Sequence, residues 1–132
     1  MYSFTKEERL CSIKLIDELY HNGSSFLLYP YRVVWLTTES LPADKPVQVL
    51  ISVPKKKFKH AVDRNLIKRR IREIYRLQKS EHLYPFINEQ SAGMLIAINY
   101  IGNEIGEYAF MEKKFTAAIT KLKKAYLESH VG

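Results

Sequence analysis

Hydrophobic positions near the start of the chain recur first at helical and then at strand spacing. Residues 5–8 have the pattern of a helix capping box, and the apolar positions after them lie three or four residues apart until Gly23; they are Leu15, Ile16, Leu19 and Tyr20. From Phe26 to Thr38 aromatic and β-branched residues alternate, which places Tyr31, Val33 and Trp35 on one face. The pattern predicts a helix that ends near Gly23 and a strand after it.

The next segment predicts a turn and a second strand. Residues 41–46 combine two prolines with Asp44, which is typical of a turn, and Val47 to Val53 is a nearly continuous apolar run that stops at Pro54. Two strands so close together could form an antiparallel hairpin.

The second half of the chain predicts two helices around one strand. A helix is expected from about His60 to Lys79, a connection over Pro85 and residues 88–91, and a strand from Met94 to Ile101. In the last helix the apolar face consists of Met111, Phe115, Ala118, Ile119, Leu122 and Tyr126. The order α-β-β-α-β-α, with room for one unrecognised strand, predicts an α+β sandwich.

Length and composition limit the class of protein. A chain of 132 residues with 46% hydrophobic and 27% charged residues predicts one globular domain, residues 1–132, and argues against global disorder. It has no apolar run near the ~20 residues of a membrane helix, and the charged start lacks a signal-peptide pattern. The lone Cys11 fits a reducing compartment. We therefore expect a cytoplasmic protein without a membrane partner.

The net charge of +7 is concentrated in one window. Residues 54–79 contain eleven Lys and Arg residues and only two acids, Asp63 and Glu73, whereas the rest of the chain is slightly acidic. Such a local excess indicates an anionic partner rather than a general solubilising coat.

On a helical wheel this window separates into a basic side and an apolar side, at about 100° per residue. The basic side holds Arg64, Asn65, Lys68, Arg69, Arg72, Arg76 and Lys79. The apolar side holds Leu66, Ile67, Ile71, Ile74 and Leu77, interrupted by Arg70, which is expected to reach the edge of the apolar face.

The basic side repeats like charges four residues apart, an unfavourable arrangement unless a ligand compensates it. Guanidinium groups bind phosphate oxygens in pairs of hydrogen bonds, so nucleic acid is the expected partner rather than a membrane surface or plain solvent. Composition alone does not separate RNA from DNA.

Residues 61–73, preceded by Lys56, resemble the Arg-Asn-Arg signature helix of the bacterial ribonuclease P protein subunit. Residues 16–23 look like the amino-terminal helix of that family, and residues 49–56 look like the strand that leads into its paired lysines. Two departures stand out. Leu66 replaces the third signature residue, an arginine, and Ile16 replaces an aromatic residue. The effect of Leu66 is left open.

The resemblance implies a sheet of about four strands packed on helices, similar to domain 2 of ribosomal protein S5. In that fold the signature helix joins two parallel strands by a left-handed crossover. General rules for crossover connections favour the right-handed form, so this expectation rests on the resemblance alone.

The resemblance also implies a function. The protein would be an RNA-binding subunit that assists a catalytic RNA in removing the 5′ leader from precursor tRNA; its partners would be these two RNAs and not DNA. Residues implied to bind the catalytic RNA are Lys55, Lys56, Arg64, Asn65, Lys68, Arg69, Arg72 and Arg76. Residues implied to meet the leader are Ile16, Tyr20, Tyr31 and Trp35, with a core position as the alternative for Tyr31 and Trp35.

Side chains for protein-based catalysis are not evident in the sequence. The acidic residues are scattered, and His21, His60, His82 and His130 lie far apart, so we expect no catalytic residue and no metal ligand in the protein. The resemblance implies that Mg²⁺ and hydrolysis belong to the RNA, with no cofactor bound by the protein alone. Two alternatives are a structural, ribosomal-protein-like RNA-binding module without a role in tRNA processing, and a stand-alone metal-dependent nuclease.

Overall fold

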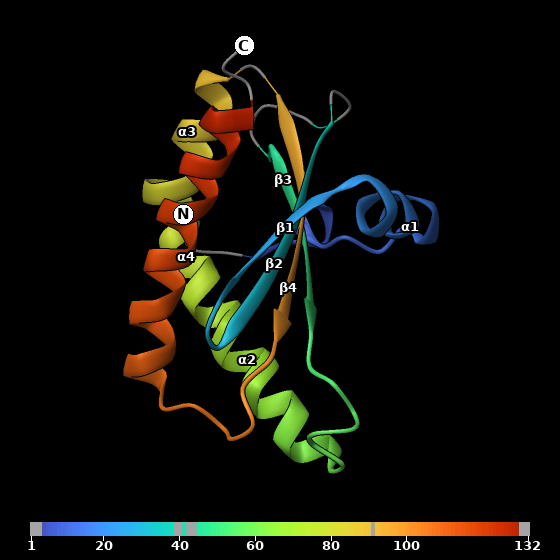
Figure 1. Cartoon of the computed structure of the whole chain (residues 1–132), viewed down its shortest axis with the longest axis vertical. Helices are drawn as coiled ribbons and strands as arrows, with labels where there is room; N and C mark the ends of the chain where they lie inside the picture. The colour runs from blue at the N-terminus through green and yellow to red at the C-terminus, as the bar shows by residue number, and fades with distance from the viewer. Residues whose placement is uncertain (1–3, 39–40, 42–44, 91, 130–132) are drawn as a thin grey trace.

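In the part of the chain that the structure describes, four strands form one sheet that carries helices on both faces (Figure 1). The computed structural model describes residues 4–38, 41, 45–90 and 92–129. The strands are β1 (Ser24–Leu28), β2 (Tyr31–Thr38), β3 (Val47–Ser52) and β4 (Gly93–Tyr100), in the sheet order β1-β2-β4-β3. The helices are α1 (Ile13–Asn22), α2 (Ala61–Gln78), α3 (Tyr84–Glu89) and α4 (Tyr108–Ser129). Two short turns complete the fold, the 3₁₀ turn η1 (Lys6–Glu8) and the π-helical turn η2 (Lys79–Leu83). The expected α+β class with about four strands is confirmed.

The strand expected from Phe26 to Thr38 is in fact a hairpin of β1 and β2. The two strands pair antiparallel, with Leu28 opposite Tyr31, across the link Tyr29–Pro30. This link lacks the Asn-Gly or Asp-Gly pattern of common two-residue hairpin turns. Pro30, which has no backbone N–H to donate to a ladder, was nevertheless an indication of a break, and β1 is the strand that the prediction did not separate.

The hairpin expected between the strands at residues 26–38 and 47–53 is wrong, because β2 and β3 are not neighbours in the sheet. β4 lies between them, antiparallel to β2 and parallel to β3. β4 is buried on both faces, as is usual for a central strand, whereas β3 reaches the sheet edge and continues into α2. The parallel pairing implied by the resemblance is confirmed, and the hand of the crossover stays a prediction. Most of the turn predicted at residues 41–46 lies outside the described residues.

Two helical segments differ from the sequence prediction, one at the amino terminus and one around Pro85. The capping box at Thr5 begins the short turn η1, where Thr5 N donates to Glu8 Oε1 at 2.9 Å. The helix α1 has its own N-cap at Ser12. The expected connection at Pro85 is the helix α3, because proline fits the first turn of a helix. Ser91, the last residue of the expected connection, lies outside the described residues. In α4 the predicted apolar face is buried as expected.

The two faces of the sheet bury two separate hydrophobic clusters. α2, α3 and α4 cover one face and share the larger cluster with alternate residues of the strands (Figure 1). α1 lies on the opposite face over a smaller cluster of Leu10, Leu19, Val34, Leu95 and Ala97. In the described part of the chain, no helix has the length and apolar character needed to cross a membrane.

Candidate nucleic-acid interface

The basic face of α2 is exposed because the opposite face of the helix is committed to the core. Ile67, Ile71 and Ile74 are fully buried in the larger cluster. The predicted basic side therefore faces outward, with Asn65, Arg69 and Arg72 exposed and Lys68 partly exposed. Arg70 reaches from the edge of the apolar face and donates to the carbonyl of Gly106, as expected for a side chain that leaves the core.

A lysine-rich turn extends this basic face at the start of α2. Lys55 and Lys56 are exposed, while Lys57 Nζ donates to the carbonyl of Ile101 at 2.7 Å. Arg64 donates through Nη1 to the carbonyls of Phe58 at 2.7 Å and Lys59 at 2.9 Å. Arg64 therefore fastens the turn to the helix in addition to contributing charge.

The charge of Arg76 is partly compensated within the protein. Its Nη2 lies 2.5 Å from Glu73 Oε1, one turn away on the same helix. The hydrogen bond from Arg76 holds the pKa of the Glu73 carboxyl below its usual range. Arg69 and Arg72, in contrast, have no carboxylate partner among the described residues.

Lys79 is not part of the basic face, in contrast to the helical-wheel prediction. Its ammonium group donates to Glu8 Oε2, and both side chains are only 3% exposed. Tyr84 Oη donates to the same carboxylate oxygen. Burial acts to raise the pKa of Glu8, but the hydrogen bonds from Lys79, Thr5 and Tyr84 outweigh it and hold the pKa low. The wheel fails here because α2 ends at Gln78 and the chain continues as η2.

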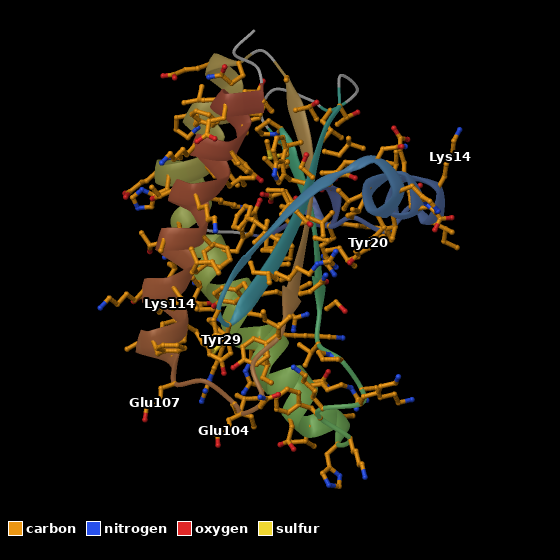
Figure 2. All side chains as sticks on the ribbon, viewed as in Figure 1. Lys14, Tyr20, Tyr29, Glu104, Glu107 and Lys114 are labelled. Atoms are coloured by element: carbon orange, nitrogen blue, oxygen red, sulfur yellow. The ribbon has the colours of Figure 1, made fainter. Side chains whose placement is uncertain are left out.

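A second group of polar side chains lies on the α1 side of the sheet. Tyr20 points from α1 toward the sheet, whereas Lys14 on the same helix points away (Figure 2). Tyr20 Oη donates to Asn99 Oδ1 at 3.1 Å. In the sheet register Asn99 lies between Arg32 of β2 and Ser52 of β3, so all three side chains leave the sheet on the same side. We call the group of Tyr20, Arg32, Ser52 and Asn99 the α1 cleft, after the leader-binding cleft that the resemblance implies.

Of the four residues implied to meet the leader, only Tyr20 lines the α1 cleft with its ring half-exposed. Ile16 is partly buried against the smaller cluster under α1. Tyr31 and Trp35 are a correction, because both lie in the larger cluster on the other face of the sheet. Tyr31 is fully buried and donates to the carbonyl of Met111 at 2.8 Å, and burial raises the pKa of its hydroxyl. Trp35 packs on Tyr126, with ring centroids 6.0 Å apart.

Sequence reasoning missed three residues of the α1 cleft and one residue beside α2. Arg32 alternates with Tyr31 and Val33, so the period of two already places it on the opposite face from them. Ser52 and Asn99 are single polar residues near the ends of apolar runs, a pattern that carries little information by itself. Arg9 lies far from the basic window in sequence, yet it lines a pocket with Arg69 and Arg72.

The described residues offer no donor set for a metal ion. Nowhere in the described ranges do three His, Cys, Asp or Glu side chains come together. Such a cluster would be needed to hold a metal ion by protein ligands alone, whereas Mg²⁺ usually keeps several waters and binds through one or two carboxylates and substrate phosphates. The exposed Lys and Arg side chains of α2 and of the turn before it can bind anions such as phosphates through charge-assisted hydrogen bonds.

Known proteins resemble this chain in sequence. A family model described as Ribonuclease P matches residues 4–101. A ribonuclease P protein component from Porphyromonas gingivalis is 32% identical over 122 residues, which cover 92% of this chain and 87% of that protein. Another from Chlorobium phaeobacteroides is 36% identical over 110 residues, which cover 76% of this chain and 73% of that protein.

Solved structures share the fold. The Staphylococcus aureus RNase P protein superposes with a TM-score of 0.69 at 22% identity and covers 89% of this chain and 95% of its own. The Thermotoga maritima RNase P protein gives a TM-score of 0.67 at 19% identity and covers 86% and 96%. At these sequence identities the superpositions show a common arrangement of strands and helices, and they do not extend to individual side chains.

Proposed function

The chain belongs to the ribonuclease P protein family, and from this we propose that its two polar surfaces hold two different RNAs. The protein is the RNA-binding subunit of an endoribonuclease that removes the 5′ leader of tRNA, and it associates with the ribonuclease P RNA. A structural RNA-binding module without a role in tRNA processing is not favoured by these relatives. What remains to be assigned is the surface that each RNA occupies.

The basic face of α2 is proposed to dock on the catalytic RNA. The observation that carries this assignment is the commitment of the isoleucine face to the core, which leaves the arginine face outward with little acid to balance it. Guanidinium groups can bind phosphate oxygens through paired hydrogen bonds, and lysines act as point charges. The docking set is Lys55, Lys56, Arg64, Asn65, Lys68, Arg69, Arg72 and Arg76.

The α1 cleft is proposed to receive the 5′ leader of precursor tRNA. Tyr20 offers a ring on which a base can stack without regard to its identity. Arg32 offers a guanidinium to a phosphate, and the amide of Asn99 and the hydroxyl of Ser52 can bond a 2′-hydroxyl. α1 and α2 lie on opposite faces of the sheet (Figure 1), so the protein can contact both RNAs at once.

Hydrolysis and its Mg²⁺ are proposed to belong to the catalytic RNA. The side chains of this protein bind and orient, and none is assigned a proton-transfer step. Cys11 is exposed and has no second thiol in the chain, which is compatible with the reducing cytoplasm where we place the protein.

The test combines purified protein, catalytic RNA and precursor tRNA in all pairings. We expect efficient cleavage at low Mg²⁺ only when the protein and the catalytic RNA are both present, with tighter binding of precursor tRNA by the complex than by the RNA alone. Cleavage by the protein alone would instead reveal a stand-alone nuclease. Binding to the catalytic RNA without any gain in precursor affinity would contradict the assignment of the α1 cleft.

A further inference from the structure

The segment Phe4–Cys11, here called the N-terminal strap, runs along the open edge of β3. Leu10 N donates to the carbonyl of Val49 at 2.9 Å, and Arg9 forms a parallel bridge with the same residue. The strap joins both hydrophobic clusters, because Phe4 packs on the larger one and Leu10 belongs to the smaller one. It is therefore part of the folded sheet rather than a loose end.

One buried carboxylate holds the strap against η2 and α3. Glu8 accepts hydrogen bonds from Lys79 and Tyr84, which lie 71 and 76 positions away in the sequence. It also accepts from Thr5 N at 2.9 Å, within the strap. A carboxylate buried with this many donors fixes the backbone on either side of it, which includes the next residue, Arg9.

Between the strap and the basic face of α2 lies a pocket of about 370 Å³. Its walls are Phe4 and Arg9 from the strap and Arg69, Arg72, Glu73 and Arg76 from α2. It adjoins a second hollow of about 190 Å³ above β3, which shares Phe4, Arg9 and Arg72 and adds Lys68. Together the two hollows form a groove, which we call the strap groove.

The strap groove gathers positive charge from two distant segments. Four guanidinium groups line its first hollow together with a single carboxylate, that of Glu73, which Arg76 already engages. Within the described ranges Arg9, Arg69 and Arg72 have no ion-pair partner. Holding like charges around one hollow is unfavourable unless an anion lies between them, and a phosphodiester has the charge and acceptor geometry that arginines bind.

Phe4 positions Arg9 at the mouth of this groove. The Arg9 guanidinium lies over the Phe4 ring, 6.0 Å from its centroid. The same ring packs edge-on against Tyr75 of α2, at 5.6 Å between centroids. The direction of the Arg9 side chain is thus tied to the core beneath α2 and not left to the solvent.

We propose that the strap groove binds the phosphodiester backbone of the catalytic RNA, with Arg9 as an RNA contact outside the signature helix. This inference rests on the proposed docking of α2. It adds that the docking surface is a groove with two walls, and that the strap supplies the second wall. Arg9 and Arg72 then share the same stretch of backbone.

The experiment compares the affinities of variants for the catalytic RNA over a series of salt concentrations. Arg9→Gln is expected to weaken binding about tenfold, as for one charge-assisted contact, and to make the log–log salt slope shallower by about 0.7 to 0.9. Lys6→Gln on the same strap and Lys14→Gln on the outer side of α1 are the matched controls, each with less than about a twofold change (Figure 2). The double variant Arg9→Gln/Arg72→Gln should lose less than the product of the two single losses, because the two side chains share one ligand.

The outcomes separate this inference from the proposed function. Parent-like affinity of Arg9→Gln together with a clear loss in Arg72→Gln would overturn the strap groove and leave the α2 docking face intact. Parent-like affinity of both variants would remove the docking face as well. A loss confined to precursor tRNA binding by the assembled enzyme would assign the groove to the substrate and contradict the proposal. Thermal unfolding of Arg9→Gln is expected to match the parent, since the side chain is exposed.

Discussion

Tyr20 and Asn99 are joined by a hydrogen bond of 3.1 Å between the last turn of α1 and the central strand β4. The bond holds the tyrosine hydroxyl toward the sheet while 41% of the residue stays exposed. One side chain of the α1 cleft thus combines a fixed polar end with an accessible ring.

Replacing Tyr20 tests whether this ring holds the leader. Tyr20→Ala is expected to cost about 1–3 kcal/mol in affinity for precursor tRNA, the value of one stacked base, with no change for mature tRNA. Tyr20→Phe keeps the ring and should retain most of the affinity. The measurement is equilibrium binding of both tRNAs to the assembled enzyme, with Ile13→Ala on the same helix as an exposed control. Equal weakening for both tRNAs would show that Tyr20 does not contact the leader.

Trp35→Ala should act on stability and not on RNA recognition. The indole is buried between the sheet and Tyr126, so its removal is expected to lower the free energy of unfolding by about 3–5 kcal/mol. Chemical denaturation measures this loss, and Leu127→Ala, at an exposed position of α4, should change little. Once folded, the variant should keep the parent's ratio of precursor to mature tRNA affinity; a selective loss for the precursor would return Trp35 to the leader site.

Arg64 and Arg72 should differ although both lie on the basic face. Arg72→Ala is expected to weaken binding to the catalytic RNA by about 1 kcal/mol or more without changing Tm, since its side chain is exposed. Arg64→Ala should also lower Tm, because it leaves the carbonyls of Phe58 and Lys59 without this donor. Filter binding and thermal unfolding of the two variants check this. Identical Tm values for both would contradict a structural part for Arg64.

Binding to the catalytic RNA should weaken steeply with salt, because each neutralised phosphate releases counterions. Replacing Lys55 and Lys56 by Gln is expected to make the log–log slope shallower by about 1 to 2. A matched pair of exposed lysines on α4, Lys113 and Lys124, serves as control and should leave the slope as it is. A flat dependence in the parent protein would exclude a phosphate-binding role for the whole basic window.

The Glu8–Lys79 pair should make stability depend on acid pH. The unfolded chain protonates this carboxyl near pH ~4.3, whereas the folded pKa lies lower, so the unfolded state binds more protons as the pH falls. The contribution of Glu8 is therefore fully present above about pH 6 and is lost on acidification. Glu8→Gln should lower the free energy of unfolding by about 3 kcal/mol at pH 7, and the difference from the parent should shrink below about pH 4. Urea denaturation at several pH values measures both. A constant difference at all pH values would argue against a charged Glu8.

The basic face of α2 was predictable because it depends only on the spacing of residues within one helix. The spacing of Ile67, Ile71 and Ile74 defines the buried side of the helix. The charged side chains on the opposite side must then face the solvent. For Lys79 the spacing within the helix led to a wrong prediction. Its wheel position assumes that the helix continues, and its partner Glu8 lies 71 positions away, where no local pattern can indicate it.

Strand pairing and the facing of Tyr31 and Trp35 depend on information that alternation does not contain. A period of two shows that the two side chains share a face, but both faces of this sheet are covered by helices in part, so apolar character does not tell which. Arg32, on the opposite face, was the better indication that the α1 side is partly open to solvent. The insertion of β4 between β2 and β3 likewise follows from long-range pairing and not from spacing along the chain.

The central position of β4 has a consequence for the order of events during synthesis. β4 pairs with both β2 and β3, and Ile96 and Ile98 belong to the same cluster as the buried isoleucines of α2. Before the ribosome has passed residue 100, the hairpin of β1 and β2 can form, but β3 lacks its neighbouring strand and α2 lacks part of its support. Contacts that span such long stretches of chain form late in folding. The arginines of α2 are therefore presented in a fixed array only after the last strand has been inserted, which ties competence for RNA docking to completion of the sheet.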